Sequence, residues 1–188
     1  MKMKLVLLVC SIVSATPAFA RQVVYHVSGG VMALTNSTMK SGQGPEGSTI
    51  LSQADAFVSH KFYGGGLFVQ YDRQGSTQTD FAFGPKIELY WKVFFLEGGY
   101  AFIMNRNFTD RTVATQKGSG YYYGFGVHVP IHGSIGASAS GRAKGMFLQA
   151  TYRFRTQKIT EQDGVALTGG NIITQQDGYP LFGLGYAF

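Results

Sequence analysis

Five charged residues lie in segments whose side chains alternate, in positions that could bring them together. Lys86 and Glu88 are two residues apart, so both lie on one face of an extended strand. The same spacing relates Arg153 to Arg155, and Glu97 lies on a third alternating segment. Charges removed from water must pair, so we expect an interior ion-pair network that either fills the protein or lines a narrow ion path. Its members are Lys86, Glu88, Glu97, Arg153 and Arg155.

Hydrolytic chemistry has one candidate pair, His26 and Ser28, which share a strand face by the same spacing. The pair is similar to that of the lipid A deacylases of the outer membrane, and this resemblance implies a His that activates a Ser nucleophile. In that family the pair lies late in the chain, with an acidic residue soon after it. Here it lies early, and the next carboxylate is Glu46 in a predicted loop. We therefore expect polar interior side chains, no catalytic residue and no enzyme.

The sequence lacks the residue patterns that a metal site, a reactive thiol or a nucleic-acid-binding surface would require. His60, His128 and His132 do not have the ligand spacing of a metal site, so we expect no metal and no cofactor. Cys10 is the only cysteine and lies in the apolar N-terminal segment, which leaves no disulfide. The formal net charge is +6 without a basic cluster, so we expect no nucleic-acid partner.

The segments around these residues are typical of strands, because large apolar residues recur at every second position. From 81 to 91 one face carries Phe81, Phe83, Pro85, Ile87, Leu89 and Trp91, and the other carries Ala82, Gly84, Lys86, Glu88 and Tyr90. The outer face of a later segment carries Leu96, Gly98, Tyr100, Phe102 and Met104. The pattern predicts eight strands, at 22–35, 49–60, 65–73, 79–90, 93–105, 119–129, 145–156 and 178–188.

Alternation alone fits two kinds of all-β protein, a soluble sandwich with its apolar face inside and a membrane barrel with its apolar face outside. The chain holds 15 Phe and 11 Tyr but only 14% charged residues, and aromatic residues recur at strand ends, which favours the barrel. Each strand is close to the about 9–11 residues that cross a bilayer. Long connections alternate with brief turns, as in outer-membrane barrels. The long connections are 36–48, 106–118 and 157–177, and the brief turns are 61–64 and 91–92. Two connections depart from this alternation: 74–78 is short where a long loop is expected, and 130–144 is long where a brief turn is expected.

The N-terminal segment predicts export. Lys2 and Lys4 precede an apolar run, and Ala18-Phe19-Ala20 has the small residues of a signal-peptide cleavage site. We expect a signal peptide at 1–20 and one outer-membrane β-barrel domain at 21–188. After the signal, no apolar run reaches the about 18–20 residues that a membrane helix needs.

The last segment predicts how the sheet closes. A sheet in a bilayer must pair all its backbone groups, so its last strand must pair with its first. Phe182, Leu184, Tyr186 and Phe188 resemble the C-terminal signature of Gram-negative outer-membrane proteins. The whole chain resembles the small eight-stranded barrels of the class that includes the OmpA transmembrane domain and OmpX. The resemblance implies a closed antiparallel eight-stranded transmembrane β-barrel, monomeric in lipopolysaccharide-containing outer-membrane lipid, and inserted by the barrel-assembly machinery.

We expect the function to lie in the extracellular loops, as a structural or surface-interaction role in the bacterial outer membrane. The loops would contact an extracellular partner whose identity the sequence does not give. A narrow pore or small-molecule conduit is the first alternative, and a lipid-A-modifying enzyme is the second.

Two substitutions test which face of the strands is inside. Glu88→Leu should destabilise the refolded protein, because it removes a carboxylate partner from an interior cation. Leu89→Glu should block insertion into a bilayer, because it places a charge on the lipid-facing side. Heat-modifiable mobility of the refolded protein on gels measures both effects. A neutral Glu88→Leu together with a tolerated Leu89→Glu would mean that inside and outside are exchanged.

Overall fold

In the computed structural model of the chain, the residues described are 22–32, 38–39, 49–59, 62–74, 77–109, 112–133 and 145–187. Most of them lie in eight long strands. These are β1 (Gln22–Met32), β3 (Thr49–Ser59), β4 (Tyr63–Gln74), β5 (Gln78–Trp91), β6 (Phe94–Phe108), β7 (Thr115–Gly133), β8 (Gly145–Gln162) and β10 (Ile173–Ala187). Two short strands, β2 (Thr38–Met39) and β9 (Val165–Ala166), and a 3-10 turn at Gly169–Asn171 lie in the connections. Within these ranges, no helix is long and apolar enough to cross a membrane.

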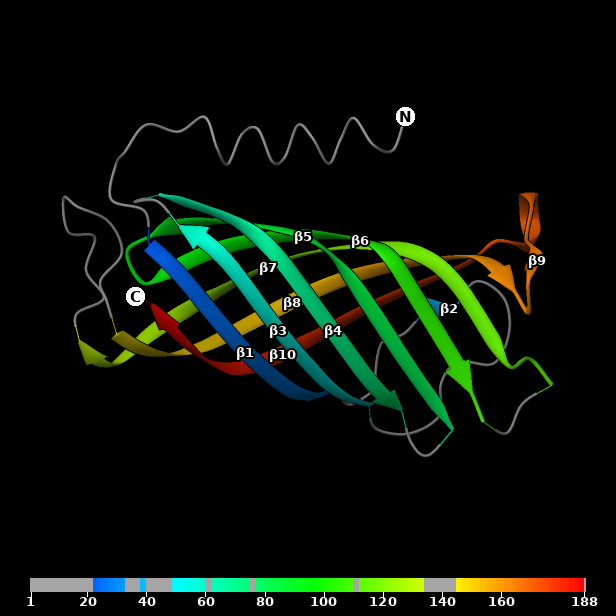
Figure 1. The fold of residues 1–188 in the computed structure, drawn as a ribbon, viewed down its shortest axis with the longest axis horizontal. Coiled ribbons are helices and arrows are strands. Elements are labelled where there is room, and N and C mark those ends of the chain that lie inside the picture. Colours follow the sequence, from blue (N-terminus) through cyan, green and yellow to red (C-terminus); the bar gives the residue numbers. More distant parts are fainter. Residues whose placement is uncertain are drawn as a thin grey trace.

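All the strands belong to one antiparallel sheet that curls around a long axis (Figure 1). Each long strand from β1 to β8 pairs with the next long strand along the chain, and β8 pairs with β10. β10 also pairs with β1, from Val24 opposite Ala187 to Gly29 opposite Phe182. The start of β1 and the end of β10 therefore lie side by side, at the left of Figure 1. We call this the turn end, and the opposite end, where β9 lies, the loop end.

The two faces of the curled sheet differ in chemistry. On β5, Lys86 and Glu88 are buried, whereas Ile87 and Leu89 beside them are exposed. β4, β7, β8 and β10 repeat the pattern, with mostly polar or small side chains inside and large apolar side chains outside. The alternation predicted for residues 81–91 is confirmed. The interior of this protein is rich in charge, and its outer surface is apolar.

The outward apolar residues form a band that ends before the strands do. On β8 the outward apolar positions run from Met146 to Phe154, and exposed Lys158 and Thr160 follow them. This stretch matches the about 9–11 residues with which a tilted strand crosses a bilayer. β8 itself continues to Gln162, beyond the apolar band.

Several strands are longer than the sequence predicts. The predicted strands 119–129 and 145–156 are Thr115–Gly133 and Gly145–Gln162 in the structure, and the last strand begins at Ile173 instead of 178. Backbone pairing between antiparallel strands does not depend on apolar outer side chains, so it continues past the band. The connections predicted at 106–118 and 157–177 are therefore shorter, and 134–144 lies outside the described residues.

Met104 departs from the predicted alternation. The sequence pattern places it on the outer face with Phe102, but it is buried, and Ile103 is exposed. Pairing between β6 and β7 is interrupted between Ala101 and Met104. Such a bulge adds a residue to one strand, so the alternation changes phase beyond it.

A tight hairpin at the loop end joins β8 to β9. Its turn residues, Asp163 and Gly164, both have positive φ, 47° and 83°, as a type I′ turn requires. The Asp163 carboxylate accepts hydrogen bonds from the backbone N–H groups of Ala114 (3.0 Å) and Thr115 (2.7 Å). These bonds hold the hairpin against the start of β7.

Close approach of two strands requires a glycine in β5 and gives a prediction. A Cβ on Gly84 would lie 1.8 Å from the carbonyl oxygen of Tyr100, whereas one on Gly65 in β4 would have no neighbour nearer than 3.9 Å, at Lys86. We expect Gly84→Ala to lower the free energy of unfolding by about 1–3 kcal/mol and Gly65→Ala to change it little. Urea unfolding of the refolded protein measures both. Equal effects of the two substitutions would contradict this packing.

Candidate functional site

The first cluster of interior charges surrounds Lys86. Its ammonium lies 2.6 Å from a carboxylate oxygen of Asp55, 2.7 Å from Glu88 and 3.1 Å from Glu97. Glu97 also pairs with Arg153, whose Nε donates to its Oε1 at 2.7 Å. We call these five residues the Lys86 cluster. Strands β3, β5, β6 and β8 supply them, so the cluster connects strands that are not all neighbours in the sheet.

Arg153 uses the shape of its guanidinium as well as its charge. It pairs with Glu97 on one side and donates a hydrogen bond to the side-chain oxygen of Gln53 on another. Its central carbon, Cζ, lies over the Tyr122 ring, 4.0 Å from the ring centre, which is a cation–π contact. A lysine could not make the planar contact and the two directed hydrogen bonds together.

A second group of charges surrounds Arg155 and lies nearer the loop end. Arg155 pairs with Asp72 of β4 and, at 3.0 Å, with Asp177 of β10. Gln70 donates to both oxygens of Asp72, at 2.9 and 3.0 Å. Gln175 donates to Asp177 at 3.1 Å. These amides accompany the two carboxylates, so neither is paired with the arginine alone.

A third group surrounds Arg106, beyond the apolar band. Arg106 binds Asp80 through two hydrogen bonds of 2.9 and 2.7 Å, the bidentate geometry that suits a carboxylate. It also donates to the side-chain oxygens of Gln157 and Gln175, each at 2.9 Å. Gln78 donates to Asp80 at 3.1 Å. Four strands, β5, β6, β8 and β10, meet in this group.

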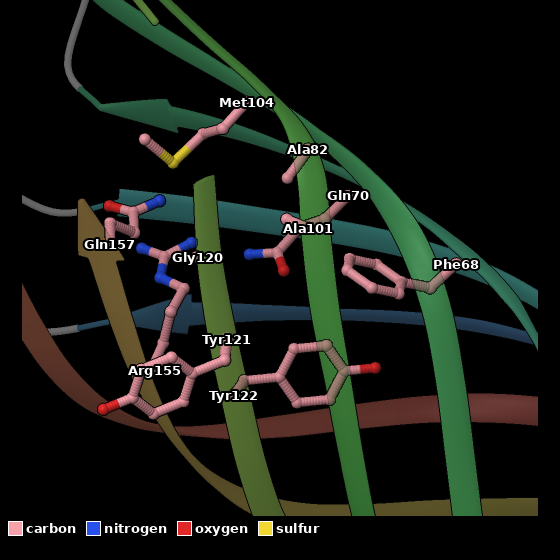
Figure 2. Close-up of a pocket in the computed structure, with 10 residues that line it drawn as sticks. All are labelled: Phe68, Gln70, Ala82, Ala101, Met104, Gly120, Tyr121, Tyr122, Arg155 and Gln157. Atoms are coloured by element: carbon pink, nitrogen blue, oxygen red, sulfur yellow. The ribbon is translucent and has the colours of Figure 1, made fainter. Parts of the chain in front are cut away.

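Apolar side chains lie beside the Lys86 cluster and leave little space. Phe68, Ala82, Ala101 and Tyr122 pack together, and the rings of Phe68 and Tyr122 meet edge to face at 5.0 Å. A small cavity lies between these side chains and Arg155 (Figure 2). Its volume, about 10 Å³, is close to what one water molecule needs. Side chains therefore fill this part of the interior.

Aromatic side chains pack around a histidine at the turn end. His128 is fully buried, and its ring stacks on Phe95 at 4.2 Å and meets Phe147 at 4.6 Å. Tyr90 lies beside it, with ring centres 6.5 Å apart. The backbone N–H of His128 donates to the carbonyl oxygen of Val93 in the β5–β6 turn, at 2.8 Å. This packing obstructs the interior near that turn.

The five charged residues singled out in the sequence are all buried, but they fall into two groups. Lys86, Glu88, Glu97 and Arg153 belong to the Lys86 cluster, and Arg155 lies in a separate group. The sequence pattern predicts which side chains face inward. It does not predict which ones meet, because that depends on the stagger between strands.

Five further charged residues lie in the interior and are not among the five named from the sequence. They are Asp55, Asp72, Asp80, Arg106 and Asp177. Asp55, Asp72 and Asp80 have the inward phase of their strands, so the alternation could have identified them. Arg106 and Asp177 lie where the sequence predicts loops, so they could be identified only once the ends of β6 and β10 were known.

The other candidates lie partly outside the described residues. His26 is opposite Asp55 and Gly185 in register, and Ser28 is opposite Gln53, while the side chains of β1 are not described. Among the described residues, no group of His, Asp or Glu side chains is arranged to hold a metal ion. Of the C-terminal residues, Phe182, Leu184 and Tyr186 are exposed on the outer face, and Phe188 lies outside the described ranges.

Comparison with known proteins finds similarity in structure. No protein-family model matches the chain, and no curated protein matches it. Similar solved structures include Neisserial surface protein A (NspA), with a TM-score of 0.48 and 12% identity, over 89% of this chain and 95% of that chain. Another is the translocator domain of the autotransporter NalP from Neisseria meningitidis, with a TM-score of 0.27 and 11% identity, over 100% of this chain and 95% of that chain. Neither likeness is strong enough to decide what this chain does.

A buried and an exposed ion pair give a matched prediction. Arg153→Met removes a buried partner of Glu97, and we expect it to lower the free energy of unfolding by about 3–5 kcal/mol. Lys117→Met removes a pair with Glu161, 2.8 Å apart, whose side chains are 58% and 34% exposed. We expect a loss of less than about 1 kcal/mol there. Urea unfolding compares the two variants, and a similar loss in both would mean that the interior pair is hydrated.

Proposed function

We propose that the chain is an integral protein of the bacterial outer membrane, a closed eight-stranded antiparallel β-barrel. One observation carries the proposal: charged side chains face inward along the strands, and large apolar side chains face outward. In water this arrangement would expose apolar surface and bury charge, both at a cost. In a bilayer the same arrangement is favourable, because lipid contacts the apolar band and the charges pair inside.

The strand pairing supports closure. β10 pairs with β8 on one side and with β1 on the other, so both ends of the row of long strands have a partner. A bilayer-spanning sheet needs this, because lipid offers no hydrogen bonds to an open edge. Export through a signal peptide, insertion by the barrel-assembly machinery, contact with lipopolysaccharide and a monomeric state belong to the same proposal.

We infer a structural and surface-interaction role without catalysis. An eight-stranded barrel is just wide enough for side chains to fill. Here the Lys86 cluster, the Arg155 group and the aromatic residues around His128 occupy the described interior. At the loop end, the β8–β9 hairpin is held by Asp163 and presents Val165, which is 67% exposed. A rigid barrel that carries an ordered hairpin outside the band suits contact with an extracellular partner.

A narrow conduit is the second candidate, and the charged interior favours it. The aligned groups around Lys86, Arg155 and Arg106 would set the ion selectivity of such a path if their contacts opened. A lipid-A-modifying activity at His26 and Ser28 has less support, because that family's acidic partner is missing nearby in the sequence.

Single-channel recording in planar bilayers separates the two leading functions. We expect the refolded protein to insert without discrete current steps, because paired side chains block the interior. Arg155→Ala, which removes a large blocking side chain, should give more current than Lys117→Ala on the outer surface. Reproducible current steps from the unmodified protein would instead favour a function as a conduit.

The enzymatic alternative has its own test. We expect outer membranes from cells that carry the chain, or its Ser28→Ala variant, to contain lipid A with the same acyl pattern. Mass spectra of the extracted lipid A measure this. A loss of acyl chains that depends on Ser28 would contradict a role without catalysis.

A further inference from the structure

One lysine on the outer face of β8 lies just beyond the apolar band, and its charge is not used within the described part of the chain. Lys158 is exposed, and no carboxylate among the described residues lies within ion-pair distance of it. Lys117, the exposed lysine on β7, is bound instead to Glu161 at 2.8 Å. The positive charge of Lys158 is therefore available to a ligand.

Hydroxyl groups surround this lysine on the outer face. Strand pairing places Ser119 of β7 opposite Lys158 on one side and Thr174 of β10 opposite it on the other. Thr156 and Thr160, the outward neighbours of Lys158 along β8, share its phase. Side chains directly opposite in a sheet have Cβ atoms about 4.5–5.5 Å apart, so a small group bound at the lysine is close to these hydroxyls. We call Ser119, Thr156, Lys158 and Thr174 the Lys158 patch.

An ammonium surrounded by hydroxyl groups suits a phosphate. The ammonium supplies a positive charge, and each hydroxyl can donate a hydrogen bond to a phosphate oxygen. A metal ion does not fit, because the lysine repels it and the patch has no carboxylate. An uncharged sugar would leave the lysine without a counter-charge. The chemistry of the patch therefore points to an anion with several acceptor oxygens.

The patch lies at the depth of lipid headgroups, on the proposed placement in a membrane. Phe154 is the last outward apolar residue of β8, and Lys158 lies four residues beyond it, toward the loop end. Four residues of a strand tilted by about 45° rise about 9 Å along the membrane normal, and each headgroup layer is about 5–8 Å thick. The backbone of Lys158 thus lies at the outer edge of this layer, and its flexible side chain can extend into it.

Below the patch, exposed aromatic rings continue the surface toward the bilayer centre. The rings of Tyr123 and Phe154 stack at 5.3 Å, and Tyr152 meets Phe154 edge to face at 5.2 Å. Gly178 of β10 is opposite Phe154 and has no side chain to cover its ring. A ligand with both a phosphate and hydrocarbon chains would contact the Lys158 patch and these rings at once.

We propose that the Lys158 patch binds the phosphate of an outer-leaflet lipid whose hydrocarbon chains lie along Tyr123 and Phe154. This inference rests on the proposed function, because it places the rings in lipid. A phosphate monoester carries about −1.5 to −2 charges at neutral pH, so the patch should prefer it to the zwitterionic headgroup of phosphatidylcholine. Lipid A, the membrane anchor of lipopolysaccharide, presents such phosphates. An inorganic phosphate ion has the charge but nothing for the rings to contact.

Retention of lipid A by the refolded protein tests the patch. The unmodified protein and its variants are refolded into phosphatidylcholine vesicles of increasing lipid A content, extracted into detergent and weighed with their bound lipid by native mass spectrometry. We expect Lys158→Gln to weaken the apparent affinity for lipid A about fivefold, as expected for one lysine near an anionic surface. Lys158→Arg should keep the affinity. Lys117→Gln, which removes a lysine that is already paired, should weaken it less than about twofold.

Two further probes separate the phosphate from the hydrocarbon chains. Lipid A from which the phosphates have been removed should bind equally to the unmodified protein and to Lys158→Gln. Inorganic phosphate, added at the concentration of lipid A, should displace none of it. Displacement would overturn the proposal, because the patch would then be a site for free phosphate.

Two other results would overturn the patch and leave the proposed function intact. Equal losses in Lys158→Gln and Lys117→Gln would mean that lipid A follows the overall charge of the outer face. Unchanged affinity in Lys158→Gln would mean that the apolar band alone holds the lipid. Both are measured on variants whose heat-modifiable mobility shows that they have folded in the vesicles. An unmodified chain that does not enter the vesicles would instead contradict the proposed function.

Discussion

The buried ammonium of Lys86 contacts carboxylates from three strands, and the need to keep such charges paired governs the rest of the interior. A lone buried charge costs several kcal/mol, so each cation requires a carboxylate at contact distance. The pairs that meet this need connect β8 to β6 through Arg153 and Glu97, and β8 to β4 through Arg155 and Asp72. These strands are not neighbours in the sheet, so the ion pairs fix its curvature from within.

Small residues make room for these pairs. Gly84 lies where β5 and β6 approach too closely for any side chain, and Ala82 and Ala101 line the cavity beside Tyr122. Tyr122, a large inward residue, contacts both a charged group, Arg153, and an aromatic ring, Phe68. The interior is thus filled by a few long polar side chains set among small ones, which suits a narrow barrel.

The sequence predicted the class of fold and the inward phase of most strands, because a period of two appears directly in residues such as Lys86, Ile87 and Glu88. It did not predict strand ends beyond the apolar band, where pairing continues through polar residues such as Lys158. It did not predict the bulge that turns Met104 inward either. Partner choice, such as Arg155 with Asp177 instead of Glu97, depends on strand stagger, which no local pattern encodes.

The β1–β10 contact differs from every other pairing of long strands in its extent. Among the described residues, the others run nearly the full length of the shorter strand, whereas this one extends from Val24 opposite Ala187 to Gly29 opposite Phe182.

The central claim is that the outer face of the strands lies in lipid, and the single tryptophan tests it most directly. Trp91 is 69% exposed on the outer face, at the turn end of the band. In vesicles of brominated lipids, we expect its fluorescence to be quenched more by bromines near the headgroups than by bromines near the bilayer centre. Fluorescence unaffected by bromines at any depth would contradict the account, because the apolar face would then not be in the membrane.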